Sequence, residues 1–314
     1  QLKTKTKLFA GVDNDAREAS PNTLISPLCI GMPGTLPVLN AAVIPLSIRA
    51  GLALRATISP TSHFDRKHYF YPDLPKGYQI TQYERPIVVD GTVEAPMLDG
   101  SYVTVGIERA HLEEDAGKSS HPTGETYSLV DLNRAGTPLL EIVSAPDMHS
   151  AEEARAYVHE LYLLMKYADV SDVDLYHGNM RFDVNVSVST DPKKLGTRSE
   201  TKNLNSFKSV EKAVEYEIKR QIRLLEKGQS IVQETRGWDD DTQQTVSQRS
   251  KEDAHDYRYF PDPDIPPITV SQEAISYEAQ TMPLLPAALR EQFGELGLDT
   301  TQISTIIELP IIAN

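Results

Sequence analysis

The chain has 314 residues, 39% of them hydrophobic and 24% charged, which is typical of a soluble globular protein with one large domain or two ordinary ones. Its formal net charge of −14 argues against wholesale binding of a nucleic-acid backbone, although a local contact with RNA stays open. The apolar runs are too short and too interrupted to span a membrane and no secretory leader is seen, so we expect a cytoplasmic protein without membrane contact.

A helix is predicted over residues 41–56, where apolar side chains recur at helical spacing. Residues 64–83 are rich in aromatics, proline and glycine, and we interpret them as a long ordered loop. Three cations, Arg66, Lys67 and Lys76, lie among these aromatics. They could bind phosphate or a nucleotide base, and ordinary loop packing with cation–π contacts is the alternative.

A strand is predicted over residues 102–110, because apolar residues alternate with other types there. Its apolar face carries Val103, Val105 and Ile107. If the alternation continues, Arg109, His111 and Glu113 lie on that same face, which predicts a site at the edge of a sheet.

Three adjacent carboxylates, Glu113, Glu114 and Asp115, follow this strand. Like charges repel, so a folded protein keeps them together on a solvated face or around a cation. With His111 they could hold Mg²⁺, which takes a few carboxylates together with water and substrate phosphates. The alternative is an acidic surface turn.

Two more carboxylates lie in predicted strands. Glu141 interrupts the apolar strand 139–143, where a carboxylate is costly unless it is paired, bound to metal or facing water from an edge. Strand 181–189 places Asp183 on its polar face, and a solvated sheet face would explain that residue equally well. Asp183 offers a third metal-ligating carboxylate if the strands are neighbours.

The second half of the chain alternates between helices and strands. Further elements are predicted as a helix over 151–167 capped by Ser150, a strand over 198–204, a long helix from Phe207 that Gly228 stops, an edge strand over 233–238 and an ordered loop over 258–267. The order of elements indicates an α+β fold. From Met282 onward the pattern is helical, so we expect one domain over 1–282 and the start of a helical domain over 283–314.

No phosphate-binding glycine loop and no Ser or Cys nucleophile motif occurs in the sequence. If a nucleotide binds, metal-bridged carboxylates and arginines must hold it. Arg258, which lies between Tyr257 and Tyr259, is a candidate together with Arg66. Loop packing is again the alternative for both.

Several long stretches together resemble the B subunit (GatB) of the aspartyl/glutamyl-tRNA amidotransferases. The matching stretches are residues 31–40, 64–79, 111–118, 128–144, 202–207, 233–236 and 255–264. They occur in the order in which the family has them and cover most of residues 1–267.

The resemblance implies a cradle-shaped α+β catalytic domain with an antiparallel sheet, related to glutamine synthetase. It implies that ATP and Mg²⁺ phosphorylate the side-chain carboxylate of Glu or Asp mischarged on tRNA(Gln) or tRNA(Asn), and that ammonia then displaces the phosphate. A partner amidase, the A subunit, would release the ammonia from glutamine, and a small C subunit would complete a heterotrimer. A carboxylate is a poor acyl donor until it is phosphorylated, and phosphoryl transfer needs Mg²⁺ and cations rather than a protein nucleophile.

Glu113 and Glu114 match the acidic pair at the family's metal and phosphoryl-transfer site. His111 and Glu141 match residues close to it, and Lys76 matches a lysine at the channel and the active-site entrance. From the residues alone we add Asp183 as a metal ligand beside Glu113, Glu114 and Glu141. Arg66 and Arg258 are added in the same way as nucleotide contacts.

Three departures from the family pattern bear on these expectations. The family's opening segment with an active-site Glu and His precedes Gln1, and its tRNA-binding helical domains follow Asn314, so we interpret the chain as a fragment. Some members hold zinc with four cysteines, but here the chain has Cys29 alone. Ala10, Val12 and Ser26 stand where partners would be, so we expect no zinc.

Three alternatives stay open. The chain could be a non-catalytic tRNA-docking scaffold of the same complex, or a stand-alone carboxylate–amine ligase of the glutamine synthetase type. The E subunit of the glutamate-only complex carries a large inserted domain, for which the close spacing of the motifs leaves no room. The sequence does not distinguish Glu-tRNA from Asp-tRNA as acceptor.

Overall fold

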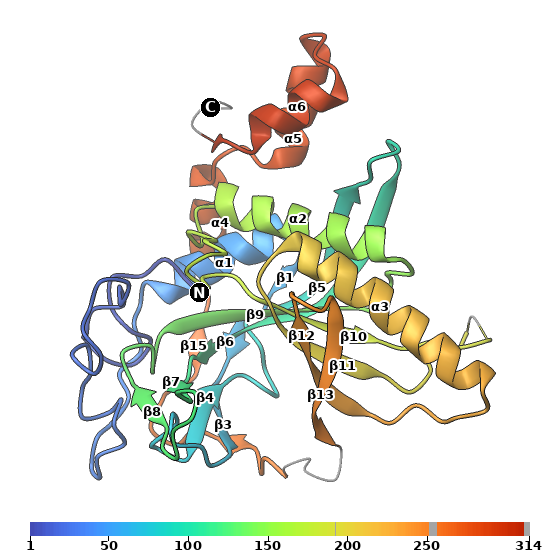
Figure 1. Ribbon diagram of the computed structural model, residues 1–314. Coiled ribbons are helices and arrows are strands. Elements are labelled where there is room, and N and C mark those ends of the chain that lie inside the picture. The colour runs from blue at the N-terminus through green and yellow to red at the C-terminus, as the bar shows by residue number, and fades with distance from the viewer. Residues whose placement is uncertain (192, 251–255, 311–314) are drawn as a thin grey trace.

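The computed structural model describes residues 1–191, 193–250 and 256–310, and Figure 1 shows the arrangement of the elements. The helices are α1 (Val43–Ala53), α2 (Ala151–Tyr167), α3 (Phe207–Glu226), α4 (Gln272–Thr281), α5 (Pro286–Glu295) and α6 (Thr300–Ile307). The strands are β1 (Thr57–Ile58), β2 (Thr61–Ser62), β3 (Asp65–His68), β4 (Tyr78–Thr81), β5 (Val88–Pro96), β6 (Tyr102–Glu114), β7 (Lys118–Ser120), β8 (Leu129–Asp131), β9 (Pro138–Ser144), β10 (Phe182–Val186), β11 (Ser199–Leu204), β12 (Glu234–Asp239), β13 (Gln244–Ser250), β14 (Phe260–Pro261) and β15 (Ile268–Thr269). His255, the first residue of one matching stretch, lies outside the described residues.

The main sheet has the order β1-β5-β6-β9, and every pair in it is antiparallel. Helices α1 and α2 both contact β5, so they cover one face of this sheet (Figure 1). The core beneath them includes Val93, Val105, Ile107 and Leu112, each at most 2% exposed. Burying such side chains is the main source of stability for this part of the fold.

A bulge in the main sheet overturns one prediction. Strand β6 continues to Glu114, beyond the predicted end at Ala110, and its register against β9 shifts between Ile107 and Arg109. The fully buried positions therefore change from Val105 and Ile107 to Ala110 and Leu112. The prediction that His111 and Glu113 share the face of Val105 is wrong, because the extra residue of a bulge reverses the alternation.

The second sheet has the order β10-β11-β12-β13, and its β11–β12 pair is parallel. Strand β12 lies between β11 and β13, so the predicted edge position of residues 233–238 is wrong. Helix α3 contacts β10, β11 and β13, as Figure 1 shows. Its predicted start is confirmed, because the Ser206 side chain accepts a hydrogen bond from the backbone N–H of Ser209.

A third sheet, β14-β3-β4, replaces the two predicted loops over 64–83 and 258–267. Arg66 pairs with both Phe260 and Ile80, so segments far apart in sequence become neighbours. Strand β4 also lies against β6. This contact brings the aromatic-rich stretches to the carboxylates at the end of the main sheet.

Helices α5 and α6 pack on α2 through a second apolar cluster, which includes Leu163, Tyr167, Leu289, Ile303 and Ile307. Their helical character confirms the prediction for the segment after Met282, although α4 begins earlier. The division into domains at 282/283, the cradle shape and the relation to glutamine synthetase stay predictions. Among the described residues, no helix combines the length and apolar character needed to cross a membrane.

Candidate active site

Three side chains from the main sheet form a candidate metal centre. His111 and Glu113 are alternate residues of β6, so both project to one side, and Glu141 of β9 is paired directly with His111. His111 Nε2 lies 3.6 Å from Glu113 Oε2 and 3.6 Å from Glu141 Oε2. One ligand atom from each residue lies within 4.8 Å of the other two.

The charges at this centre are unequal. Burial raises the pKa of Glu113, but the nearby His111, the charge of Lys67 and the hydroxyl of Thr81 outweigh it and leave that pKa below its usual range. Partial burial, followed by the charge of Glu113, raises the pKa of Glu141 above its usual range. Two carboxylates held this close repel each other, and a divalent cation between them would relieve the repulsion.

The donor set fits a divalent cation. Two carboxylate oxygens and one imidazole nitrogen converge, and His111 Nδ1 is buried without a hydrogen-bond partner among the described residues. Carboxylates suit Mg²⁺ and Mn²⁺, and the imidazole is more typical of a transition metal such as Mn²⁺. A cation bound by these three residues would keep its remaining positions for water or substrate oxygens.

A cation and several aromatic rings from the third sheet border this centre. Lys67 Nζ lies 4.7 Å from the ring centroid of Tyr257, and its charge lowers the pKa values of Glu113 and Glu141. Burial, and then the charge of Glu113, raises the pKa of Tyr69. Burial is also the first cause that raises the pKa of Tyr259 to about 12, and the charges of Glu113 and Glu141 contribute. Both tyrosine rings lie beside Tyr257, with centroids 6.2 Å and 6.0 Å from its own.

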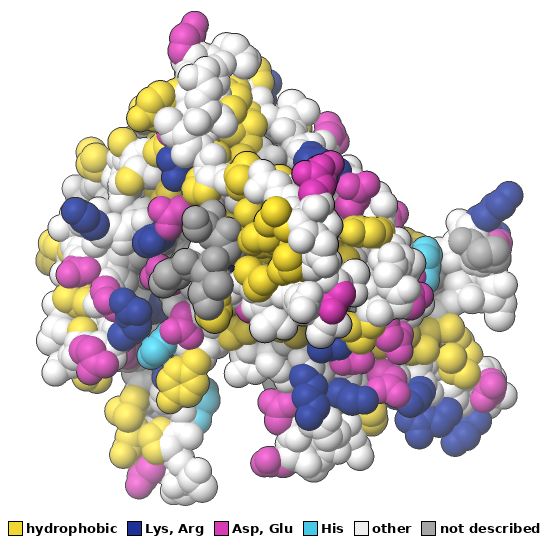
Figure 2. Space-filling model, turned by 90° about the horizontal axis from the view of Figure 1, so that it is seen from above, with side chains coloured by type: hydrophobic (Ala, Val, Ile, Leu, Met, Phe, Trp, Pro, Cys, Tyr) yellow, Lys and Arg dark blue, Asp and Glu magenta, His cyan; other side chains and the backbone are white. Residues whose placement is uncertain are grey.

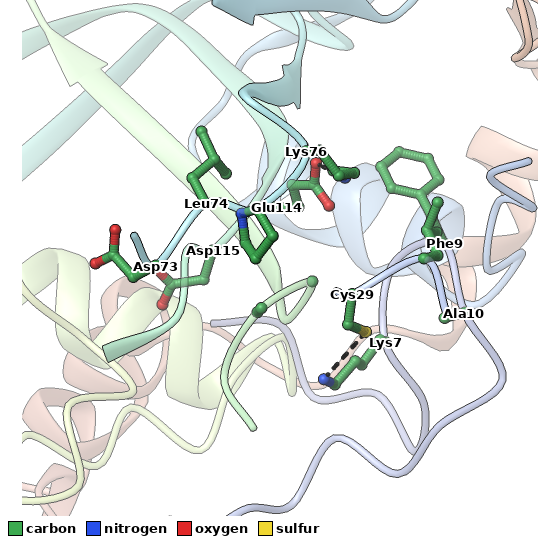
Figure 3. Close-up of a pocket in the computed structure, with 13 residues that line it drawn as sticks. Lys7, Phe9, Ala10, Cys29, Asp73, Leu74, Lys76, Glu114 and Asp115 are labelled. Carbon is green, nitrogen blue, oxygen red and sulfur yellow. Dashed lines mark hydrogen bonds and ion pairs between the residues drawn. The ribbon is translucent and has the colours of Figure 1, made fainter. Parts of the chain in front are cut away.

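Glu114 serves a second, separate arrangement. Its Oε1 forms an ion pair with Lys76 Nζ and accepts a hydrogen bond from the backbone N–H of Ile80 at 3.0 Å. The two side chains of this pair are only 8% and 4% exposed. Lys76 and Glu114 line a pocket together with Lys7 and Cys29, and Figure 3 shows the two pairs in one view.

A family model described as the GatB/GatE catalytic domain matches residues 1–276. The chain belongs to this family.

Curated relatives agree with this membership. The B subunit of the aspartyl/glutamyl-tRNA(Asn/Gln) amidotransferase from Synechococcus sp. is 49% identical over 302 residues, which cover 94% of this chain and 61% of the relative. The corresponding B subunit from Thermodesulfovibrio yellowstonii is 52% identical over 301 residues, covering 95% and 62%. That of Nostoc sp. is 48% identical over 324 residues, covering 100% and 66%. The chain therefore spans a little under two thirds of the length of these relatives.

The structure brings some of the predicted site residues of this GatB/GatE domain together and separates others. His111, Glu113 and Glu141 converge, whereas Glu114 lies with Lys76. Within the described part of the chain, Asp183 does not join the group of ligand atoms, and Lys202 Nζ lies 3.4 Å from its Oδ2. Asp183 lies in another sheet, which explains its separation.

The two predicted nucleotide contacts differ in their surroundings. Arg66 is engaged by Asp262 and Asp264, with both N···O distances 2.8 Å, and its guanidinium lies 4.3 Å from the ring centroid of Tyr78. It therefore holds β3 to the segment after β14. The side chain of Arg258 is 82% exposed and lies 3.6 Å from Asp256.

Two site residues were not predicted. Lys67 was weighed as a cation among aromatics but was not placed at the metal centre, and Thr81 was not considered. Thr81 Oγ1 lies 3.3 Å from Glu113 Oε2. Asp65, Lys67 and Tyr69 are alternate residues, a spacing that would have indicated a strand with these three side chains on one face. The interpretation of residues 64–83 as a loop left this strand unrecognised.

The surroundings of Cys29 bear on the zinc expectation. Lys7, which is 1% exposed, places its Nζ 3.5 Å from Cys29 Sγ, and Ser26 Oγ lies 3.3 Å from the same sulfur. The polar groups next to the Cys29 sulfur are thus a lysine and a serine, whereas a zinc site would need further thiolates or imidazoles there. The absence of zinc stays a prediction.

Proposed function

We propose that the chain is the catalytic part of the B subunit of a cytoplasmic tRNA-dependent amidotransferase. It would phosphorylate the side-chain carboxylate of Glu on tRNA(Gln) or Asp on tRNA(Asn), using ATP and Mg²⁺. Ammonia from a partner amidase, the A subunit, would then replace the phosphate, and a small C subunit would complete the assembly. The observation that carries this proposal is the convergence of His111, Glu113 and Glu141 within the catalytic domain of this family.

The carboxylates of Glu113 and Glu141 would bind Mg²⁺, and His111 would hold the two carboxylates in position. When bound, the cation supplies charge neutralisation for the phosphate oxygens. Lys67, whose charge helps to lower the pKa of Glu113, is the second positive group available to a transferring phosphoryl group. Thr81 would orient Glu113 through its hydroxyl.

Lys76 and Glu114 would act on the ammonia side of the reaction. Their ion pair is buried and borders a pocket that is also lined by Cys29, Lys7 and Asp115 (Figure 3). Asp115 is held by Arg181 at 2.9 Å and by Arg134 at 3.4 Å, so the pocket wall is fixed. A small polar molecule that moves along this wall would reach the strand end from the side opposite the metal centre.

The deciding experiment follows ATP-dependent conversion of Glu-tRNA and Asp-tRNA to their amides by the full-length protein assembled with its amidase partner. We expect conversion that requires both ATP and Mg²⁺, and the acceptor that reacts identifies the substrate. Glu113→Gln should lower the rate by at least about 100-fold, since a metal-ligating carboxylate is lost. Glu125→Gln, at an exposed position, is the matched control and should leave the rate unchanged.

Other results would favour the alternatives. Intact tRNA binding without conversion by the assembled protein would support a docking scaffold. Conversion that persists after the amidase partner is removed, with glutamine as the nitrogen source, would support a stand-alone ligase. Full activity of the Glu113→Gln assembly would refute the assigned site while leaving the family membership untouched.

A further inference from the structure

Two tyrosine rings next to the metal centre form a parallel stack. The centroids of Tyr83 and Tyr259 are 4.1 Å apart, and their planes differ by 10°. Tyr83 is 59% exposed, so one part of its ring is open to a ligand. Its backbone N–H donates to Asp65 Oδ2 at 2.8 Å, so the ring projects from a fixed point of the backbone.

The stack continues toward the interior through further rings. Tyr257 lies 6.0 Å from Tyr259 and 6.2 Å from Tyr69 in edge-to-face arrangements. These contacts give the exposed end of the stack a rigid support. Rigid aromatic rings lose little entropy when a flat ligand stacks on them.

The stack flanks the metal centre on the side of β4. Thr81, the last residue of β4, contacts Glu113, and Tyr83 follows two residues later in the bend after the strand, so the stack begins within two residues of a contact to the metal centre. Tyr259 stacks on Tyr83, and Pro261, two residues later, pairs with Asp65, which itself pairs with Thr81, so both rings lie at the end of the third sheet that holds Thr81. A ligand on the stack would therefore have its other end close to the metal centre.

Exposed arginines lie on the same two segments as the rings. Arg85 is exposed two residues after Tyr83, and Arg258 directly precedes Tyr259. Asp256, itself 80% exposed, lies 3.6 Å from Arg258, and Glu84 lies between Tyr83 and Arg85. An exposed ion pair of this kind is weak and exchanges readily with another anion such as phosphate. Rings with neighbouring arginines are the combination that binds single-stranded nucleic acid.

We propose that the Tyr83–Tyr259 stack receives the terminal adenine at the 3′ end of the aminoacyl-tRNA. The amino acid esterified to that nucleotide would then extend to the metal centre, and the preceding phosphates would pass Arg85 and Arg258. This inference rests on the proposed function. The adenine of ATP fits less well, because its phosphates belong at the metal centre and would leave the two exposed arginines without a phosphate to contact.

The test measures KM for Glu-tRNA and KM for ATP separately, with the full-length protein assembled with its amidase partner. Tyr83→Ala should raise KM for Glu-tRNA by about 5- to 150-fold, the equivalent of about 1–3 kcal/mol for one stacked base. KM for ATP should not change. Tyr83→Phe keeps the ring and should behave as the unsubstituted protein. Tyr176→Ala, which removes a 92% exposed tyrosine elsewhere, is the matched control.

A second measurement needs no altered protein. Glu-tRNA whose terminal base has been removed should raise KM by a similar factor with the unsubstituted assembly, and Tyr83→Ala should add little to that loss. Additive losses, an unchanged KM for Glu-tRNA with Tyr83→Ala, or an increase confined to ATP would each overturn the inference. If the unsubstituted assembly forms no amide at all, the proposed function itself has failed.

Discussion

Glu113 and Glu114 are adjacent in the sequence and meet different groups in the fold. Glu113 converges with His111 and Glu141, whereas Glu114 pairs with Lys76. The carboxylate pair of the motif is therefore not a pair of equivalent ligands. Different kinds of measurement should distinguish the two residues.

Removing one partner of the buried Lys76–Glu114 pair should strongly destabilise the protein. Lys76→Met should lower the free energy of unfolding by about 3–5 kcal/mol, because the buried Glu114 carboxylate loses its counter-charge. The double substitution Lys76→Met with Glu114→Gln should recover part of that loss. Denaturant unfolding measures both values.

The control for this comparison is an exposed lysine. Lys194 is 79% exposed and lies 3.7 Å from Asp191, so Lys194→Met should have little effect. Equal effects of the two substitutions would show that Lys76 and Glu114 are not a buried pair.

Glu141 predicts a dependence of stability on pH. Its pKa is raised in the folded protein, so above its ordinary value the folded state holds more protons than the unfolded state, and stability falls as pH rises through this interval. Glu141→Gln removes this effect. From about pH 4 upward, the Glu141→Gln variant should therefore become more stable to unfolding than the metal-free unsubstituted protein. The difference in free energy of unfolding should grow with pH but stay below about 1 kcal/mol, because the side chain is half-exposed.

Denaturant unfolding across this pH range measures the difference, with Glu125→Gln as the exposed control. A difference that is independent of pH would contradict the assignment. The same substitution should weaken Mn²⁺ binding, because a ligand oxygen is lost.

The sequence supported part of this site. His111 and Glu113 could be selected from the carboxylate run that follows a predicted strand, and Glu141 from its place within an apolar strand, and the two strands proved to be adjacent. Asp183 met the same criterion but lies in another sheet, and the alternation of one strand does not reveal which strands are neighbours. Lys67 was not placed at the centre because its neighbourhood depends on the pairing of β3 with β4 and β14.

At the scale of elements, the bulge in β6 positions the site. Asp90 on the facing strand β5 has φ +53°, so both strands depart from regular geometry at the same level. Gly91 follows, and a Cβ there would lie 2.8 Å from Leu54 O and 2.8 Å from Ala56 Cβ. The close approach of residues 54–56 therefore requires glycine at this position.

Gly91→Ala should destabilise the main sheet. The added methyl group must displace backbone, so the free energy of unfolding should fall by about 1–3 kcal/mol, and Mn²⁺ binding should weaken as the bulge shifts. Denaturant unfolding and metal titration measure the two effects. Gly11→Ala is the control, because a Cβ there would have no atom of the described residues within 4 Å. A neutral Gly91→Ala would show that the sheet can relax around this position.

Helices were more predictable than short strands. Periodicity indicated α1, α2 and α3, and the structure confirms the predicted cap of α2 at Ser150 and the predicted start of α3 at Phe207. Strands β3, β4 and β14 have two to four residues, too few for a clear alternation. The pairing of β14 with β3 joins segments far apart in the sequence, and a local pattern carries no information about it.

At the scale of the whole molecule, α5 and α6 are attached to α2 at a few points. Arg290 forms an ion pair with the buried Glu160, and Tyr167 Oη donates to the carbonyl of Ile307 at 2.9 Å. A small apolar cluster fills the interface. We expect this pair of helices to open as a unit before the sheets unfold.

Arg290→Ala should loosen that attachment. The buried Glu160 carboxylate would lose its partner, so amide hydrogen exchange in α5 and α6 should accelerate by at least about tenfold, while exchange in β5 and β6 stays unchanged. Hydrogen-exchange mass spectrometry resolves these segments. Arg17→Ala, at an exposed pair with Asp15, is the control. Uniform acceleration across the chain would contradict a separate helical unit.

The acidic charge of the whole molecule is compatible with a local RNA contact. Figure 2 shows acidic and basic side chains interspersed on the face seen from above, and neither sign covers it alone. The composition indicated such a mixed surface, since a chain with a net charge of −14 still has 31 basic residues that can form local positive groups. Which residues form them depended on the fold.

Because neighbouring residues at the end of β6 face two different spaces, the length of this segment matters as much as its composition. Inserting or deleting one residue between the bulge and His111 would turn His111 and Glu113 away from the metal centre and Glu114 away from Lys76. Such a change would keep every chemical group and still disconnect both sites. In related chains we therefore expect substitutions at the other positions of this segment, outside His111, Glu113 and Glu114, to be tolerated more often than changes in its length.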